Sequence, residues 1–346
     1  MKTLFLTCLL LLSIASFGKI WIVDNNVGST AKDFTSLMEA HDGASAGDTL
    51  YLIGSPNNYK SGNNDVTNVI TKRLVIIGPG YFLSENPNTQ VSPASSYLTT
   101  VLFCNEEIEF APGSEGSVMM GLIIRRIKIT TNNIIIKRNL FVDGACPSEK
   151  ITISGSNIFI VQNYIGGTGN GTGIKVNAGF SNIVINNNFI LNYCYGCGGG
   201  IVSLNSANSS LEVSNNIFTG GINVSNSIVQ NNIFLTNNIF SASTSIVRNN
   251  LHVFNSLPAG NGNTNGVSTT SMFEGPGSTD GQWKLKIGSL AIGVGFNGVD
   301  CGMFGGPEPY VLSGIPPIPT IYSLTAPAVG EKNTGLPIQI KVKSNN

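Results

Sequence analysis

One pattern of apolar and polar residues recurs along residues 132–252. The order of positions in each copy is apolar, any, apolar, any, any, Asn, any, apolar. The alternation predicts a short β-strand with one buried face. The two variable positions before the asparagine interrupt this alternation, which predicts a bend in the chain. The repeated asparagines are Asn139, Asn163, Asn188, Asn216, Asn232, Asn238 and Asn250. Asparagine tolerates the left-handed backbone of a sharp corner, and its amide can bond to the next copy, so the repeat predicts a solenoid of stacked coils.

The spacing of these asparagines distinguishes between kinds of solenoid. The intervals are 24, 25, 28, 16, 6 and 12 residues, and the longer ones also suit a leucine-rich repeat. However, the apolar residues are mostly Ile, Val and Phe, which favour strands, and the step from Asn232 to Asn238 is too short for a helix and its return. We therefore predict an all-β parallel β-helix, right-handed because parallel crossover connections almost always are. The step from Asn232 to Asn250 would also fit a left-handed β-helix, but the earlier intervals do not.

The first residues are typical of a secretory signal peptide. Lys2 precedes an apolar run over residues 4–15, and Ser16 and Gly18 offer small residues at a cleavage site. The run is too short to span a bilayer, so we expect residues 1–18 to be removed and the mature chain to be exported to the periplasm, the outer surface or the medium. No later stretch of the sequence predicts a membrane span.

The remaining segments predict a cap, early coils and a tail. Residues 33–40 suggest an amphipathic helix that covers the first coil, with Ser36 and Glu39 as a capping box. Strands are expected over residues 19–22, 48–53, 73–77 and 336–342, with a further coil within residues 117–129. Proline is too dense over residues 307–327 for a regular helix or an interior strand. We expect one β-helix domain over residues 19–306 and a Pro-rich C-terminal extension over residues 307–346.

Several of these segments resemble a known group of proteins. Residues 20–24 (IWIVD), 46–51 (AGDTLY) and 72–80 (KRLVIIGPG) resemble the entry region of secreted bacterial right-handed β-helix proteins of the pectin-lyase-like superfold. Residues 285–306 resemble their closing coil, with Leu290 where a proline is usual. The resemblance implies the fold for most of the mature chain. It leaves the function open, because this superfold includes lyases, hydrolases, esterases and adhesins.

Charge and acid content limit the chemistry. Charged residues are 11% of the chain and the net charge is +0, which does not favour a nucleic acid or an anionic membrane as partner. Residues 126–128 (RIK) match a tripeptide of polygalacturonases, but those enzymes also need a pair of carboxylates and a histidine between glycines. Neither His41 nor His252 is flanked by glycine, so we interpret the tripeptide as two outward cations around an inward Ile127.

Neither a metal site nor a redox site is predicted. Glu212 is the only acid between residues 151 and 250, too few for the carboxylates of a calcium-dependent lyase. Cys194 and Cys197 form a C-x-x-C, but no helix start or further ligand follows them. We interpret them as a local disulfide or two packed thiols. After removal of Cys8, five cysteines remain, so at least one is unpaired or pairs with another chain.

An apolar strip supplies the candidate binding residues. If the residue two after each asparagine points inward, the residue directly after it points outward. These outward residues are Leu140, Tyr164, Phe189, Ile217, Ile233 and Leu251. We expect a loop, or the Pro-rich tail from Tyr310 onward, to pack over the strip. The alternative is a binding face for a partner chain or for sugar rings, which stack on Tyr164 and Phe189. The cations Lys137, Arg138 and Lys175 are candidates for a basic patch that contacts an acidic sugar, or else a scattered solvated surface.

These observations favour an exported β-helix protein that interacts with carbohydrate at the cell surface and has no evident catalytic residues or cofactor. One alternative is a polysaccharide lyase or glycoside hydrolase with its site in the early coils, where several acids lie. These are Asp65, Glu106, Glu107, Glu109 and Asp143. The other alternative is a structural or adhesion protein. The sequence identifies neither the glycan nor the oligomeric state.

Overall fold

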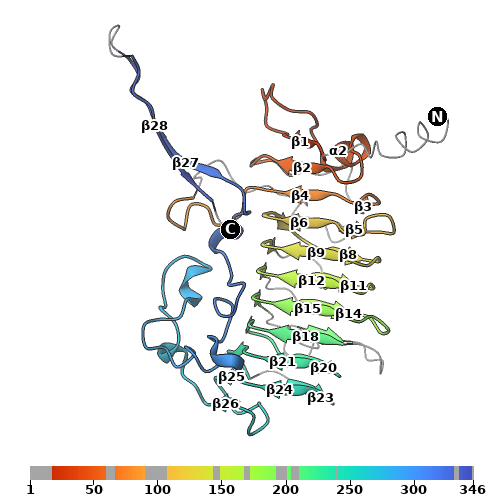
Figure 1. Ribbon diagram of the computed structural model, residues 1–346, viewed down its shortest axis with the longest axis vertical. Coiled ribbons are helices and arrows are strands. Elements are labelled where there is room, and N and C mark those ends of the chain that lie inside the picture. The colour runs from red at the N-terminus through yellow and green to blue at the C-terminus, as the bar shows by residue number, and fades with distance from the viewer. Residues whose placement is uncertain are drawn as a thin grey trace, which may run out of the picture.

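The computed structural model describes residues 18–59, 67–89, 107–142, 149–166, 172–191, 201–203, 210–237, 240–330 and 335–344. Within this part the chain forms a right-handed parallel β-helix, as predicted (Figure 1). Three parallel sheets, called A, B and C here, run along the solenoid, and each complete coil supplies one strand to each sheet. The order within a coil is sheet C, then A, then B, as in β8, β9 and β10.

Sheet A has ten strands and forms one long side of the solenoid. Its strands are β1 (Ile20–Val23), β2 (Thr49–Leu52), β4 (Val75–Ile77), β6 (Val118–Met120), β9 (Ile134–Lys137), β12 (Ile158–Val161), β15 (Ile183–Asn186), β18 (Leu211–Ser214), β21 (Ile228–Gln230) and β24 (Ile246–Arg248). Most are four residues or shorter with alternate residues buried, which is the apolar alternation seen in the repeat.

Sheets B and C have eight strands each. Sheet B consists of β7 (Ile123–Ile124), β10 (Leu140–Phe141), β13 (Tyr164–Ile165), β16 (Phe189–Ile190), β19 (Ile217–Phe218), β22 (Ile233–Phe234), β25 (Leu251–His252) and β26 (Thr264–Asn265). Sheet C consists of β3 (Asn68–Ile70), β5 (Ile108–Phe110), β8 (Ile127–Ile129), β11 (Ile151–Ile153), β14 (Ile174–Val176), β17 (Ile201–Ser203), β20 (Ile222–Ser225) and β23 (Phe240–Ser243).

The core is built from columns of equivalent residues in successive coils. In sheet B the register aligns Phe141 with Ile165, then Ile190, and Phe218 with Phe234. All of these side chains are buried, and the Phe218 and Phe234 rings stack with centroids 4.9 Å apart. Because each coil alone cannot bury its apolar face, the column is what stabilises the stack.

The N-terminal cap is shifted along the chain from the prediction. Helix α2 spans Leu37–Gly43, and the Ser36 hydroxyl accepts a hydrogen bond from the Glu39 amide at 3.2 Å, as expected for a capping residue. Asp33 and Phe34 are not helical because their amides donate to the carbonyl of Ile22, which covers the free edge of β1. Leu37 and Ala40 are buried in the core of the first coils, so the helix covers this end.

Residues 285–306 do not form a closing coil, contrary to the expectation from the resemblance. The coils end at β26, and residues 267–316, the return segment, run back along the outside of sheet B (Figure 1). The return segment contains short 3-10 turns at Thr269–Ser271, Gly281–Trp283, Phe296–Gly298 and Leu312–Gly314. It packs sideways because the outward side chains of sheet B are apolar and need a cover.

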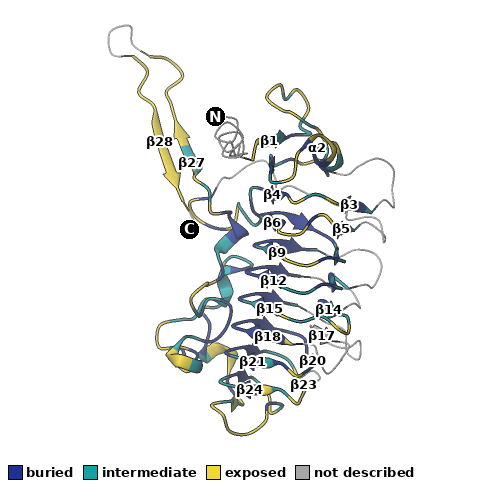
Figure 2. Ribbon diagram, turned by 45° about the vertical axis from the view of Figure 1, so that its right-hand side comes forward, coloured by how far each residue is buried: buried dark blue, intermediate teal, exposed yellow. Residues whose placement is uncertain are grey.

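The chain then leaves the solenoid as an antiparallel hairpin of β27 (Thr320–Thr325) and β28 (Gln339–Lys343). The strand β28 was expected, but β27 was not, because it lies between Pro319 and Pro327. A two-stranded hairpin has only edge strands, which proline tolerates at their ends. Figure 2 shows the contrast between the buried coil strands and this exposed hairpin. In the described part of the chain, no helix is long and apolar enough to cross a membrane.

Candidate functional site

Each corner between sheets A and B is made by two consecutive residues with different roles. The first residue has a left-handed backbone, with φ between 51° and 58°. These first residues are Arg138, Gln162, Asn187, Asn215, Asn231 and Asn249. The left-handed position is therefore the residue before each repeated asparagine, a choice that the doubled asparagines leave open in the sequence. Asparagine is enriched in this conformation, which accounts for the Asn-Asn pairs at the later corners.

The second residue of each corner turns its side chain into the solenoid. The Asn188 amide nitrogen donates to Asn216 Oδ1 at 3.0 Å and to the Ile160 carbonyl at 2.8 Å, and Asn163 donates to Asn188 Oδ1 at 3.0 Å. The same bonds continue through the asparagine row, which consists of Asn139, Asn163, Asn188, Asn216, Asn232, Asn250 and Asn263. Asn238 lies outside the described residues, and the repeat pattern did not reveal Asn263.

The first corner residues hold the return segment in place. The Asn187 amide donates to the carbonyls of Met303 and Gly305 at 2.8 and 2.7 Å, and Gln162 donates to Pro309 at 2.7 Å. The other corner residues bind the segment from Val294 to Ile315 in the same order. Because this order is opposite to that of the coils, the return segment runs antiparallel to the axis along which the coils stack.

The apolar strip is covered, so two predicted ligand-binding residues are unavailable. Tyr164 and Phe189 are 8% and 1% exposed. Their rings stack with centroids 4.6 Å apart, and the Trp283 ring of the return segment stacks on Phe189 at 4.9 Å. The cover is mainly a loop segment that begins well before Tyr310, so of the two expected covers, a loop or the tail, the loop is the main one. The strip is buried because a continuous apolar row of this length is poorly solvated when exposed.

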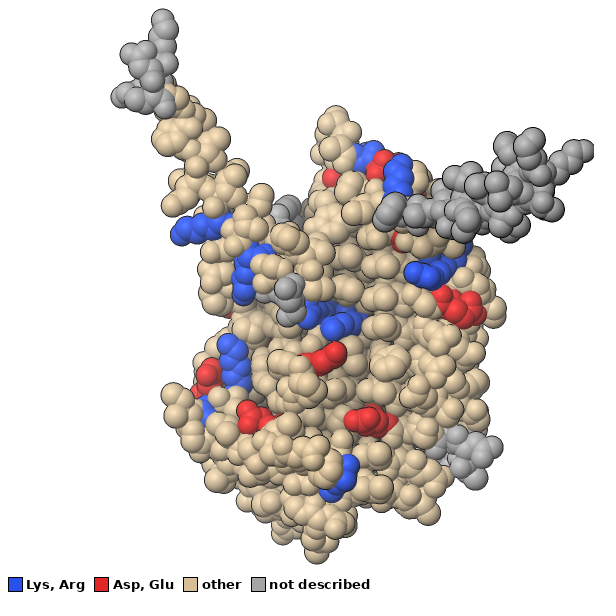
Figure 3. All heavy atoms as spheres, viewed as in Figure 1, with Lys and Arg blue, Asp and Glu red and all other residues tan. Residues whose placement is uncertain are grey.

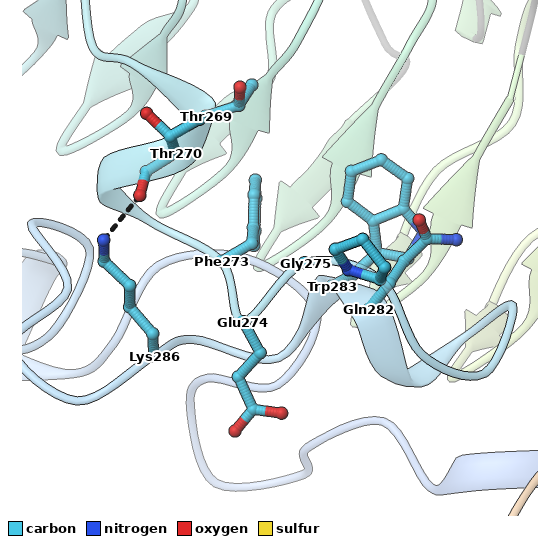
Figure 4. Close-up of a pocket in the computed structure, with 9 residues that line it drawn as sticks. Thr269, Thr270, Phe273, Glu274, Gly275, Gln282, Trp283 and Lys286 are labelled. Carbon is cyan, nitrogen blue, oxygen red and sulfur yellow. Dashed lines mark hydrogen bonds between the residues drawn. The ribbon is translucent and has the colours of Figure 1, made fainter.

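A pocket opens in the return segment above this ring stack. Its volume is about 400 Å³, and Figure 4 shows the residues around it. They are Thr269, Thr270, Phe273, Glu274, Gly275, Pro276, Gln282, Trp283 and Lys286. Phe273 and Trp283 meet edge to face with centroids 5.4 Å apart, and the Lys286 ammonium donates to the Thr270 carbonyl at 2.5 Å. Aromatic rings and hydrogen-bonding groups therefore line one cavity.

The walls of the pocket are held by local pairing. The Glu274 amide donates to the Lys284 carbonyl at 2.9 Å, and Phe273 bridges to Leu285 in antiparallel fashion. The Lys286 amide donates to the Met272 carbonyl at 3.0 Å. Met272 is fully buried, so both sides of the pocket are fixed to the covered strip. A site fixed in this way needs little reorganisation to bind a ligand.

A buried polar cluster anchors the segment next to the pocket. The Asp280 carboxylate is fully buried and accepts hydrogen bonds from Asn86 Nδ2 at 2.9 Å and from the Ser313 amide at 2.7 Å. Tyr310 also donates to it at 3.2 Å, and the Tyr81 and Tyr310 hydroxyls lie 2.8 Å apart. Burial raises the pKa of both tyrosines well above 10, so they stay neutral. The cluster is closed to solvent, and its role is to join three segments of the chain.

The predicted cations do not gather into a patch. Arg138 is 3% exposed and donates to Gln162 Oε1 at 2.7 Å, Lys137 lies 3.9 Å from Glu308, and Lys175 pairs with Glu149 at 3.1 Å on sheet C. Each has an acceptor within the chain, as a buried or half-buried cation requires.

The acids of the early coils are paired with cations where the structure describes them. Glu107 lies 3.3 Å from Arg126, and Glu109 lies 3.2 Å from Lys128, its register partner on the neighbouring strand. Ile127 between the two cations is buried, as predicted. Asp65, Glu106 and Asp143 lie outside the described residues. Among those described, no group of three or more His, Cys, Asp or Glu could hold a metal ion.

Neither histidine is placed to act as a base. The His252 ring is buried and its Nδ1 accepts a hydrogen bond from the Phe254 amide at 2.8 Å. Desolvation by burial lowers the pKa of His252, which keeps the ring neutral. His41 Nε2 accepts from the Thr71 amide at 3.1 Å, which ties helix α2 to the next loop. Both rings therefore serve packing and local structure.

The cysteines show no reactive thiol in the described residues. Cys301 is free and buried against the apolar strip, and burial raises the pKa of its thiol to about 12. A thiol with so high a pKa is a poor nucleophile at neutral pH. Cys194 and Cys197 lie outside the described residues.

Sequence reasoning missed the pocket because it lies outside the repeat. Phe273, Glu274 and Trp283 belong to a glycine-rich segment with no periodic pattern that would place them. The one available signal was the pair of large aromatic residues in a segment otherwise read as loop. A loop cannot easily bury Phe and Trp by itself, so both had to contact another surface.

Comparisons with known proteins do not assign a family. No family model matches the chain, and no curated protein matches it. Among solved structures it is similar to the crystal structure of pectate lyase Pel9A, with a TM-score of 0.48 and 15% identity over 84% of this chain and 96% of that one. At this identity and TM-score the likeness does not indicate an activity.

Proposed function

We propose that this chain is an exported carbohydrate-binding β-helix protein without catalytic activity, and that the pocket beside Phe273 and Trp283 is its binding site. The observation that carries the proposal is Trp283, whose partly exposed ring is held by the buried rings of Phe189 and Phe273 and is surrounded by hydrogen-bonding groups. Sugar rings have apolar C–H faces that pack on aromatic rings and hydroxyls that need donors and acceptors. Export by a signal peptide over residues 1–18 is part of the same proposal.

The residues around the pocket suit binding better than hydrolysis. Glu274 is the only acid among them, whereas glycoside hydrolysis uses two carboxylates on either side of the scissile bond. The Glu274 carboxylate and the Gln282 amide are able to accept and donate hydrogen bonds to sugar hydroxyls. A volume of about 400 Å³ is near the lower end of the range for ligand pockets. We therefore expect a short glycan or a chain end as the ligand.

The two tryptophans make a direct test available. Trp21 lies in the first coil, where its indole N–H donates to Asp48 at 2.8 Å, far from the pocket in sequence and fold. In the Trp21→Phe variant, Trp283 is the one fluorescent tryptophan, and titration with a panel of neutral and acidic oligosaccharides should give a saturable change in its emission. The matched control is Trp283→Phe, whose remaining Trp21 should not respond.

Binding strength gives a second readout. Calorimetry with a glycan found in the panel should show Kd raised by at least about tenfold in Trp283→Leu and in Glu274→Ala, since each removes one major contact. Glycan binding that is unchanged in both variants would place the site elsewhere. Release of reducing or unsaturated ends from any glycan by the purified protein would show that it is an enzyme and would overturn the proposal.

A structural or adhesion role is a second candidate, favoured by the outward face of sheet A. One column of this face is apolar along most of its length and includes Val118, Ile135 and Phe159, with Ile246 54% exposed at its end. Figure 3 shows that charged side chains are sparse on this side of the molecule. Adhesion that persists in Trp283→Leu but is lost in Phe159→Asp would favour this candidate.

A further inference from the structure

The C-terminal hairpin leaves the body of the protein with one apolar face uncovered. It projects away from the coils in both views (Figure 1 and Figure 2). Its strands are directly paired at Ile321 and Val342 and at Leu324 and Ile340. Cross-strand partners lie on the same side of an antiparallel sheet, so these four side chains share one face.

The register of β27 is adjusted to keep that face apolar. Ile321 and Leu324 are three residues apart and would point to opposite faces of a regular strand. A register shift between Ile321 and Ser323 inserts one extra residue, Tyr322, and returns Leu324 to the side of Ile321. The opposite face is polar, with Ser323 paired to Lys341. The hairpin is thus amphipathic by sequence and by backbone geometry.

The apolar face has no cover within the described chain. Ile321 is 51%, Leu324 66%, Ile340 53% and Val342 56% exposed, and Ile338 beside them is 57% exposed. An isolated two-stranded hairpin is marginally stable in water, and an amphipathic sheet is stabilised by a second layer on its apolar side. A hairpin of this composition is therefore incomplete by itself.

We propose that this face binds the same face of a second copy of the chain, which gives a dimer with two-fold symmetry. Two hairpins packed face to face form a small four-stranded sandwich with layers ~10 Å apart. Lys341 and Lys343 lie on the polar face, so the surfaces that meet carry no charge and no like-charge repulsion opposes the contact.

The size of the face fits a second copy. Five apolar side chains that are each about half exposed leave on the order of 500 Å² per hairpin, and a dimer would bury on the order of 1,000 Å², near the lower limit for a specific interface. The hairpin stands away from the coils (Figure 1), and none of its residues belongs to the core clusters of the solenoid. We expect a dimer that dissociates on dilution, independent of any glycan.

The test is sedimentation equilibrium of the full mature chain over a range of concentrations up to about 100 µM. The test variant is Leu324→Thr with Ile340→Thr, a cross-strand pair that keeps strand propensity but makes the face polar. The control is Ser323→Thr with Lys341→Thr, the neighbouring pair on the polar face. We expect the test variant to weaken dimerisation by at least about 100-fold and the control to leave it within about threefold.

Other results would overturn the proposal. A wild-type chain that stays monomeric at the highest concentration would show that no second copy binds, and would point to a different partner for the face. A dimer that forms equally well in the test variant would place the interface elsewhere. Far-UV circular dichroism and the melting temperature of the coils should match wild type in both variants, because the hairpin contributes no residue to the core.

Discussion

The asparagine row makes a quantitative prediction about Asn188. Its Oδ1 accepts hydrogen bonds from the backbone amide of Asn163 at 2.8 Å and from the Asn163 side chain at 3.0 Å. Its own amide nitrogen donates to the Ile160 carbonyl at 2.8 Å. All these groups are buried, so water does not replace a lost bond. In Asn188→Ala, the Asn163 backbone N–H loses its acceptor and the Ile160 carbonyl loses this donor.

The cost follows mainly from the Asn163 backbone N–H, because the Ile160 carbonyl lies in the ladder between β12 and β15 and keeps a backbone partner there. A buried polar group that loses its partner costs ~1–3 kcal/mol, so the free energy of unfolding should fall by ~1–3 kcal/mol. Asn216 Oδ1 adds little, because it still accepts from the Asn188 backbone amide at 3.0 Å. A loss of this size is a sizeable fraction of the ~5–15 kcal/mol of an ordinary domain, so Asn188→Ala should be clearly destabilising.

The assay is urea unfolding followed by far-UV circular dichroism, with Asn186→Ala as control. Asn186 is half-buried on the outward face of sheet A, and its side chain accepts a long bond from the Ser214 hydroxyl at 3.3 Å. Its loss should change the free energy of unfolding by no more than ~0.5 kcal/mol, the range for ordinary surface positions. If the two variants unfold alike, the amide bonds along the row contribute no net stability and the reasoning fails.

Three further predictions concern the corner, the buried histidine and the return segment. Asn187→Gly keeps the left-handed backbone but loses the bonds to Met303 and Gly305, so hydrogen exchange should rise in the return segment around residue 303 while the coils keep their protection. Because burial lowers the pKa of His252 from 6.5, the unfolded chain binds more protons than the folded chain just below pH 6.5. The free energy of unfolding should therefore fall as the pH drops through this window, and His252→Phe should flatten that part of a pH–stability curve. Asp280→Ala leaves the Ser313 amide and Asn86 without their buried acceptor, so the melting temperature should fall, by more than in an Asp300→Ala control, whose carboxylate accepts from the Gly293 amide at a partly exposed site.

The coils could be predicted from the sequence because their cause is local. The inward residues at Ile134 and Ile136, or at Ile183 and Ile185, alternate within one strand, and strand period alone places them in the core. Asparagine also marked a corner in every clear copy. The same interval held a further signal, since Asn133, Asn157 and Asn182 each precede a repeated asparagine by six residues. They bond along the corner between sheets C and A, from Asn157 to Asn133 at 3.0 Å and from Asn182 to Asn157 at 2.8 Å.

The cover and the pocket could not be predicted because their cause is not local. Trp283 stacks on Phe189, nearly a hundred residues earlier in the chain, and no periodic pattern links them. The sequence favoured a cover for the strip, by a loop or by the tail from Tyr310 onward, but did not identify the loop. The covering residues lie between Val267 and Leu312, and only some of them belong to the stretch that resembled a closing coil. The resemblance of residues 285–306 to a closing coil therefore predicted the wrong position for that stretch. The need to cover the apolar outward residues of sheet B predicted its position better.

The two-residue corner explains how a segment without regular structure encloses a pocket. The inward asparagine fixes the distance between coils at about 4.8 Å, so the outward amides of Asn187, Asn215 and Asn231 stand at the same spacing along the outside. A chain that runs back over them finds a hydrogen-bonding partner at each coil and needs no strand or helix of its own. Its remaining backbone is free to turn at glycines and to enclose a pocket, because the coils beneath supply the rigidity. Substitutions around Phe273 and Glu274 are thus expected to change what binds while leaving the solenoid intact, the usual division between scaffold and loop.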